Sequence, residues 1–133
     1  MKHRVTSRAL AGVALAAVLL GGASSAFAGM TYEKFSTTVP RLNGSGYTGA
    51  QTKAITNAHV QMYNLVVGGP YQVDARAIGT STATFSGWIR RVNDGQQRYI
   101  PNRITKGTGT RIEFSNDLGT LQRVQVEGRW RSQ

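Results

Sequence analysis

The feature that most constrains the fold of this chain is an alternation of apolar and polar residues with a period of two. The alternation is clearest in the closing segment, residues 121–133, where Val124, Val126 and Trp130 fall on one side. Successive side chains of a β-strand point to opposite sides, so these three residues predict the core side of a strand. The other side carries Arg123, Gln125, Glu127, Arg129 and Arg131. The segment is therefore interpreted as a half-buried strand whose polar side faces either water or an anionic partner.

Similar patterns predict further strands. Residues 71–77 and 110–114 alternate in the same way, and residues 32–39 are interpreted as a first strand. Residues 80–92 are rich in threonine and in aromatic and branched residues, which favour strands. The alternation breaks there at Gly87, which predicts a bulge at that glycine.

Residues 52–67 fit two structures. A helical stripe would pass through Ala54, Ala58, Met62 and Leu65, whereas a strand face would pass through Ala54, Thr56, Ala58, Val60 and Met62. Asn57 and Asn64 are poor helix formers, and the surrounding segments read as strands, so a strand is favoured. About six or seven short strands, with glycine-rich turns and no strand–helix alternation, indicate a small antiparallel β-sandwich or barrel.

Two turn signals predict β-hairpins. Residues 116–119 contain Asn, Asp and Gly, which favour a turn from the strand at 110–114 into the closing strand. The Asp-Gly pair at residues 94–95 is a strong signal for a short turn within residues 88–103. Pro101 has no N–H to donate, so it suits an edge strand in this second hairpin.

The second hairpin would bring arginines together. A two-residue loop places Arg91 opposite Arg98, and a three-residue loop places Arg90 opposite Arg98, whereas a five-residue loop removes the opposition. Directly opposed like charges cost about 0.2–1 kcal/mol, and an anionic ligand would turn that repulsion into attraction. The candidate ligand-binding residues are Arg90, Arg91, Arg98, Tyr99, Arg103, Arg129 and Arg131. The alternative is a solvated basic surface that discourages edge-to-edge aggregation.

Residues 1–28 have the pattern of a secretory signal peptide. Basic residues come first, residues 9–20 are apolar, and small residues occupy Ala26 and Ala28. The apolar run is much shorter than the roughly 20 residues that span a bilayer, so cleavage after Ala28 is favoured over a membrane anchor. We expect a bacterial protein that is secreted and extracellular, with residues 29–133 forming one β-rich domain that has no transmembrane segment.

Charge and composition suggest the kind of partner. Lys2, Arg4 and Arg8 account for three of the sixteen basic residues, which leaves thirteen against six acidic residues, a formal net charge of +7. Ten of those thirteen are arginine, whose planar fork suits carboxylate and phosphate groups, although a GC-rich genome would also enrich arginine. The chain has no cysteine, so disulfides are excluded and packing alone must stabilise the fold.

Most catalytic chemistry lacks its residues. His59 is the only histidine after residue 28, so a site with two histidines is excluded, and no thiol can replace one. The Gly-x-Ser-x-Gly motif of serine hydrolases is absent. A pair of carboxylates for glycoside cleavage is formally possible, but most of the six, among them Asp74 and Glu113, fall at turns or outward positions where solvated charge is expected. We therefore expect no enzyme, no catalytic residue, no metal and no cofactor.

Aromatic residues offer a second way of binding, by stacking on sugar rings. Tyr47 and Tyr99 are expected to be free, whereas Trp88 and Trp130 are expected in the core. The leading hypothesis is a secreted, basic, non-enzymatic β-domain that binds an anionic or sugar-containing cell-surface partner, such as an anionic polymer, a glycan or an acidic protein surface. Nucleic acid is not expected outside the cell. The alternatives are a bacteriocin-like toxin that acts on a competitor's envelope, and an inhibitor of a secreted enzyme.

Overall fold

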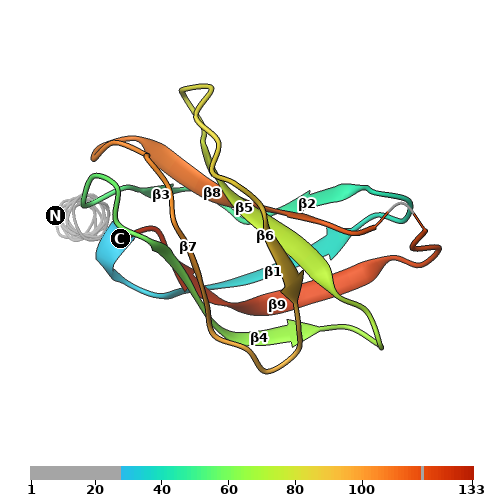
Figure 1. Cartoon of the computed structure of the whole chain (residues 1–133). Coiled ribbons are helices and arrows are strands. Elements are labelled where there is room, and N and C mark those ends of the chain that lie inside the picture. Colours follow the sequence, from blue (N-terminus) through green and yellow to red (C-terminus); the bar gives the residue numbers. More distant parts are fainter. Residues whose placement is uncertain (1–27, 118) are drawn as a thin grey trace, which may run out of the picture.

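The computed structural model describes residues 28–117 and 119–133, and in these residues it is all-β (Figure 1). The predicted signal segment, residues 1–27, lies outside the described residues. No helix in the described part of the chain is long and apolar enough to cross a membrane. The elements are a short 3-10 turn η1 (Ala28–Met30) and strands β1 (Glu33–Val39), β2 (Ser45–Tyr47), β3 (Gln51–Thr52), β4 (Val60–Val67), β5 (Val73–Gly79), β6 (Ile89–Val92), β7 (Arg98–Ile100), β8 (Gly109–Ser115) and β9 (Val124–Arg131).

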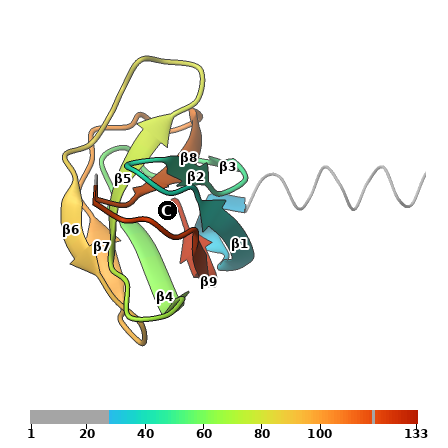
Figure 2. The same ribbon diagram turned by 90° about the vertical axis from the view of Figure 1, so that its right-hand side faces the viewer.

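The strands form two antiparallel sheets, which confirms the predicted fold class. The four-stranded sheet has the order β1-β9-β4-β7, and the five-stranded sheet has the order β2-β8-β5-β6, with β3 also paired to β8. Figure 2 shows the sheets as two layers, with their edge strands β6 and β7 side by side. The described part of the chain has nine strands, more than expected, because β2 and β3 are too short to show an alternation in the sequence.

The hydrophobic core lies between the two sheets. Val124, Val126 and Trp130 are all buried in it, as the alternation in the closing segment predicted. Phe35 of the four-stranded sheet and Phe114 of the five-stranded sheet stack with ring centroids 5.4 Å apart. The polar side of each strand therefore faces outward, so the molecule has two outer faces, one on each sheet.

Both predicted hairpins are wrong. β8 pairs with β2, β3 and β5, whereas β9 pairs with β1 and β4, so the chain passes from one sheet to the other between β8 and β9. In the same way, β6 pairs with β5, and β7 pairs with β4. The predicted opposition of arginines across a β6–β7 hairpin is therefore absent. Turn residues specify a reversal of the chain, but they do not specify which sheet the next strand joins.

Two predicted strands are shorter in the structure. In residues 80–92 only β6 is a strand, and residues 80–88 form a loop joined to β5 by an isolated bridge between Ile78 and Phe85. The register shift lies between β5 and β6 beside Arg90 and Arg91, and not at Gly87. In residues 52–67, Thr52 ends β3, and the favoured strand then forms from Val60 to Val67.

Candidate functional site

The seven predicted binding residues do not form one surface. Tyr99, Arg129 and Arg131 lie on the outward side of the four-stranded sheet, which we call the open face. Arg90 and Arg91 belong to β6 in the other sheet, and Arg98 lies between the two sheets. Arg103 follows β7 in a loop and lines a different hollow, together with Phe85 and Pro101. As predicted, Pro101 comes at the end of an edge strand.

The centre of the open face is a row of two cations and a tyrosine. Strand pairing sets Lys34 of β1 directly opposite Arg129 of β9, and Arg129 opposite Tyr63 of β4. All three side chains are exposed. The like-charge opposition expected between β6 and β7 is thus found here, between β1 and β9. Directly opposed like charges repel each other, so an anion bound between Lys34 and Arg129 would relieve their repulsion.

A second row lies beside the first, and its arginine is held in place. Gln61 is paired with both Tyr99 and Arg131. The Oε1 atom of Gln61 accepts hydrogen bonds from Arg131 Nε and from the Tyr32 hydroxyl, each at 2.8 Å. The guanidinium carbon of Arg131 lies 4.7 Å from the centroid of the Tyr32 ring, and that ring lies 6.0 Å from the ring of Tyr63. The row therefore presents pre-positioned cation and aromatic groups.

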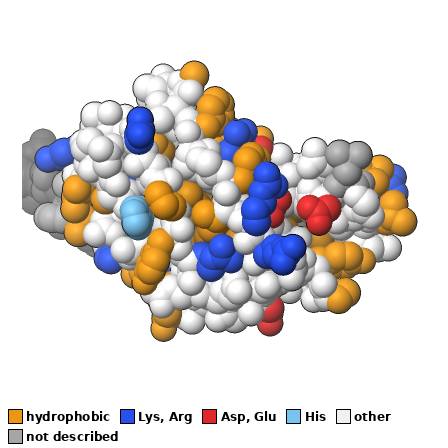
Figure 3. All heavy atoms as spheres, in the orientation of Figure 1, with side chains coloured by type: hydrophobic (Ala, Val, Ile, Leu, Met, Phe, Trp, Pro, Cys, Tyr) orange, Lys and Arg blue, Asp and Glu red, His pale blue; other side chains and the backbone are white. Residues whose placement is uncertain are grey.

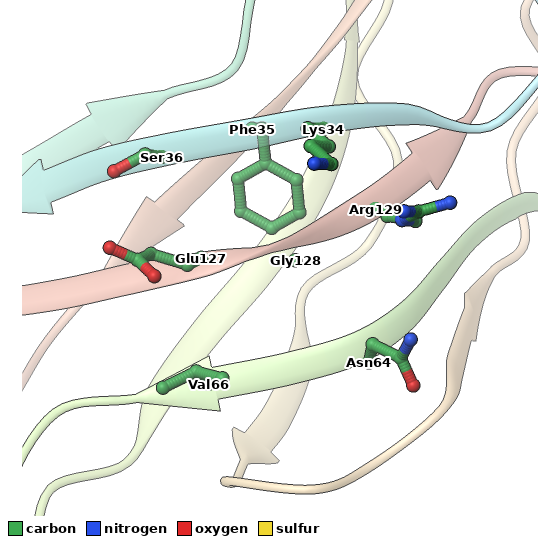
Figure 4. Close-up of a pocket in the computed structure, with 8 residues that line it drawn as sticks. All are labelled: Lys34, Phe35, Ser36, Asn64, Val66, Glu127, Gly128 and Arg129. Carbon is green, nitrogen blue, oxygen red and sulfur yellow. The ribbon is translucent and has the colours of Figure 1, made fainter.

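A hollow of about 470 Å³ opens between β1, β9 and β4 (Figure 4). Lys34 and Arg129 lie at one end of it, and Ser36 and Glu127 lie at the other. Gly128 helps to line the hollow, and a Cβ atom there would lie 3.0 Å from the Tyr63 carbonyl oxygen and 3.2 Å from Cε1 of Phe35. A side chain at this position would force its neighbours to move by a few tenths of an ångström, so glycine suits this close approach of three strands.

Within residues 28–117 and 119–133, the opposed cations of the open face, Lys34 and Arg129, have no ion-pair partner. The described residues contain two salt bridges, and both lie on the outward side of the five-stranded sheet, which we call the paired face. There Arg76 Nε lies 2.7 Å from Glu113 Oε1, and Arg90 Nη1 lies 2.6 Å from Asp74 Oδ2. On the open face, Glu127 is paired with Ser36 and not with a base. Arg111 of the paired face also has no salt bridge among the described residues and lies over the ring of Tyr47. The open face differs because two of its unpaired cations lie directly opposite each other.

Arg98 has a structural role at the seam between the sheets. Its Nη1 donates to the carbonyl oxygen of Arg91, and its Nη2 donates to that of Arg90, both at 3.1 Å. Arg91 has a positive φ of 56°, which is unusual for a residue with a side chain. Asp74 supports this bulge by accepting from the Arg91 N–H at 3.2 Å. Arg98 thus joins the edge of β7 to the edge of β6. On the side of the molecule that Figure 3 shows, basic and acidic side chains lie next to each other.

The paired face also carries aromatic residues, and Trp88 is not where it was expected. It is half-buried and lies outside the core cluster, whereas Trp130 is in the core as predicted. Tyr47 and Tyr99 are exposed, as expected. Lys34 lies in the segment that was predicted as a first strand, but it was not among the predicted binding residues. Its opposition to Arg129 depends on strand pairing, which the sequence does not reveal.

His59 and Lys53 could carry chemistry of another kind, but neither belongs to the open face or to the ion pairs of the paired face. His59 is exposed, and no group of three potential metal ligands occurs among the residues that the structure places. Lys53 is buried, and its Nζ donates to the carbonyl oxygens of Ser132, at 2.6 Å, and of Ala58. Burial lowers the pKa of Lys53 from 10.5 to about 8. Lys53 therefore ties the end of β9 to the segment before β4, and it is not part of a binding face.

No protein-family model and no curated protein matches this chain. Its function is therefore inferred from the geometry of its two faces.

Proposed function

We propose that this protein is a secreted, non-enzymatic binding domain that holds an anionic, sugar-containing polymer of a cell surface on its open face. The observation that carries the proposal is the direct opposition of Lys34 and Arg129, which have no carboxylate partner among the described residues. An anionic group placed between the two cations would replace a repulsion by two attractions.

The tyrosines favour a glycan over a simple anion. Tyr63 and Tyr99 are 43% and 49% exposed, and both belong to the rows that contain Arg129 and Arg131. Aromatic rings stack on the apolar faces of sugar rings, while lysine and arginine bind carboxylate or phosphate groups. The rows cross three or four strands, so they match a polymer chain better than a single small ion.

Binding to a polymer of uronic acid tests the proposal. The purified protein is expected to bind polygalacturonate at about 0.02 M salt and much more weakly at about 0.5 M salt, because salt screens exposed charges. Neutral dextran of the same length serves as the comparison polymer. The double variant Lys34→Gln/Arg129→Gln should bind polygalacturonate about tenfold or more weakly at low salt, since each cation near an anionic surface contributes about 1 kcal/mol.

The matched control is Arg91→Gln/Arg103→Gln, which removes the same charge from outside the open face. It should keep most of the affinity for polygalacturonate. An equal loss of affinity in both double variants would mean that general charge, and not the open face, attracts the polymer. Absence of binding to polygalacturonate by the unaltered protein at low salt would overturn the proposal altogether.

A further inference from the structure

A second pocket, on the paired face, has a different chemistry from the open face. Its volume is about 380 Å³, at the small end of the roughly 300–1,000 Å³ of small-molecule sites. Its walls combine hydrogen-bonding groups from four segments, namely Asn43, Ser45, Asp74, Arg90, Glu113 and Ser115. One aromatic side chain, that of Trp88, completes the lining. A pocket of this size suits one ring of a polar ligand.

Each carboxylate in the lining of this pocket is paired with an arginine, one inside the lining and one outside it. The carboxylate of Asp74 is paired with Arg90, and that of Glu113 is paired with Arg76. An anionic ligand would meet the carboxylates of Asp74 and Glu113, and a cationic ligand would meet the Arg90 guanidinium group in the wall. A neutral ligand is repelled by neither kind of group, so the pocket favours neutral ligands over charged ones.

Both the Asp74 carboxylate and the Arg90 guanidinium group can form further hydrogen bonds. A carboxylate accepts at about four lone-pair positions, and Asp74 uses one for Arg90 Nη1 and one for the Arg91 N–H. A guanidinium group has five N–H donors, and the Arg90 side chain is 67% exposed. A sugar hydroxyl both donates and accepts, so neighbouring hydroxyls of one ring can use the acceptors and the donors together.

The aromatic wall is held in a fixed orientation. The guanidinium carbon of Arg76 lies 4.6 Å from the ring centroid of Trp88 and 4.5 Å from that of Phe85. Arg76 is itself held by Glu113, which is only 6% exposed and also accepts from the Ser45 hydroxyl at 2.7 Å. Trp88 is therefore positioned before any ligand arrives, which lowers the entropy lost on binding.

We propose that this pocket binds one ring of a neutral saccharide, with the ring stacked on Trp88 and its hydroxyls bonded to Asp74, Glu113 and Arg90. Sugars combine an apolar C–H face with a rim of hydroxyls, which is the combination that the pocket offers. The site is separate from the open face in position and in charge, so the protein has one site for a polyanion and another for a neutral sugar.

Tryptophan fluorescence and calorimetry test this site. The chain has two tryptophans, and Trp130 is buried, so a ligand-induced change reports on Trp88. We expect one of a panel of neutral hexasaccharides, built from glucose, xylose, mannose or N-acetylglucosamine, to cause a saturable change that persists at about 0.5 M salt. Trp88→Ala should weaken calorimetric binding of that sugar about tenfold or more, whereas Tyr99→Ala, an exposed aromatic of the other face, should not.

The outcomes separate the two sites. Circular dichroism of Trp88→Ala should match the unaltered protein, because Trp88 lies outside the core cluster. The Lys34→Gln/Arg129→Gln variant should keep its affinity for the neutral sugar even where it loses polygalacturonate. The inference is overturned if no neutral hexasaccharide gives a saturable change. It is also overturned if Trp88→Ala binds the sugar as well as the unaltered protein, or if the open-face variant loses the sugar.

Discussion

The two outer faces of the sandwich are both built from antiparallel strands, yet the neighbours of their basic side chains differ. On the paired face, Arg76 and Arg90 each lie against a carboxylate. On the open face, Lys34 lies opposite Arg129, and the neighbouring Glu127 lies opposite a serine. The difference comes from strand pairing and not from composition, since both faces carry alternating basic and acidic residues. Pairing thus decides which part of a basic protein attracts an anion.

The faces also differ in how they hold their aromatic side chains. Tyr63 and Tyr99 of the open face stand on strands β4 and β7, whose alternate residues are buried in the core. Phe85 and Trp88 of the paired face come from the loop before β6 and are fixed by stacking on Arg76. The open face therefore depends on the packing beneath it, and the paired face depends on an ion pair.

The largest expected effect comes from the core that the two faces share. Trp130 is 2% exposed and points inward between Arg129 and Arg131. Trp130→Ala should cost about 3–5 kcal/mol of unfolding free energy, because it leaves a large cavity. Thermal denaturation should show a fall of more than about 10 °C, and both binding activities should be lost at the same temperature. A shift of the melting temperature by only a few degrees would mean that Trp130 packs loosely.

Two matched glutamate substitutions sharpen the comparison. Glu113→Gln removes a nearly buried carboxylate that is bonded to Arg76 and Ser45, so it should cost about 2–3 kcal/mol. Glu127→Gln removes an exposed carboxylate of the open face that has no ion pair among the described residues, so its cost should stay within about 0.5 kcal/mol. Urea denaturation measures both. Equal costs would contradict the distinction between a paired and an open face.

The pH dependence of the unfolding free energy distinguishes the buried Lys53 from the arginines of the two faces. The pKa of Lys53 is about 8 in the folded protein and 10.5 when exposed, so between these values the unfolded chain binds more protons. Stability should therefore rise by about 1–2 kcal/mol between about pH 7 and about pH 9.5, because the cost of burying the ammonium group disappears. Arginine keeps its charge over this range, so Lys53→Arg should remove the rise. Urea denaturation at each pH gives the measurement, and a rise that persisted in Lys53→Arg would assign it to other groups.

The smallest expected effect has the opposite sign. Lys34→Gln should raise the unfolding free energy by about 0.2–1 kcal/mol at low salt, because it relieves the repulsion from Arg129. Lys106→Gln, which removes an exposed lysine from a loop, should leave stability unchanged. A loss of stability in Lys34→Gln would mean that the opposed cations are already neutralised by another group.

The sequence predicted the faces of individual strands better than their arrangement. The burial of Val124, Val126 and Trp130 followed from an alternation within one segment, and such a pattern is local. The opposition of Lys34 and Arg129 joins segments far apart in the chain, so no local pattern reveals it. Trp88 was expected in the core from its position in a predicted strand, but it lies in a loop, and Arg76 provides a partner for its ring outside the core.

The position of β9 has a consequence for the synthesis of the protein. β9 lies between β1 and β4, and the only strands both paired and consecutive in the described chain are β5 and β6. As the chain leaves the ribosome, β1 has no partner in its sheet until β9 is made, and folding through such distant pairings is slow. We expect chains truncated before Val124 to remain sensitive to proteases and to expose the edges of β1 and β4 to other chains. Pulse-chase proteolysis of stalled chains would reveal whether protection appears only after β9 has emerged.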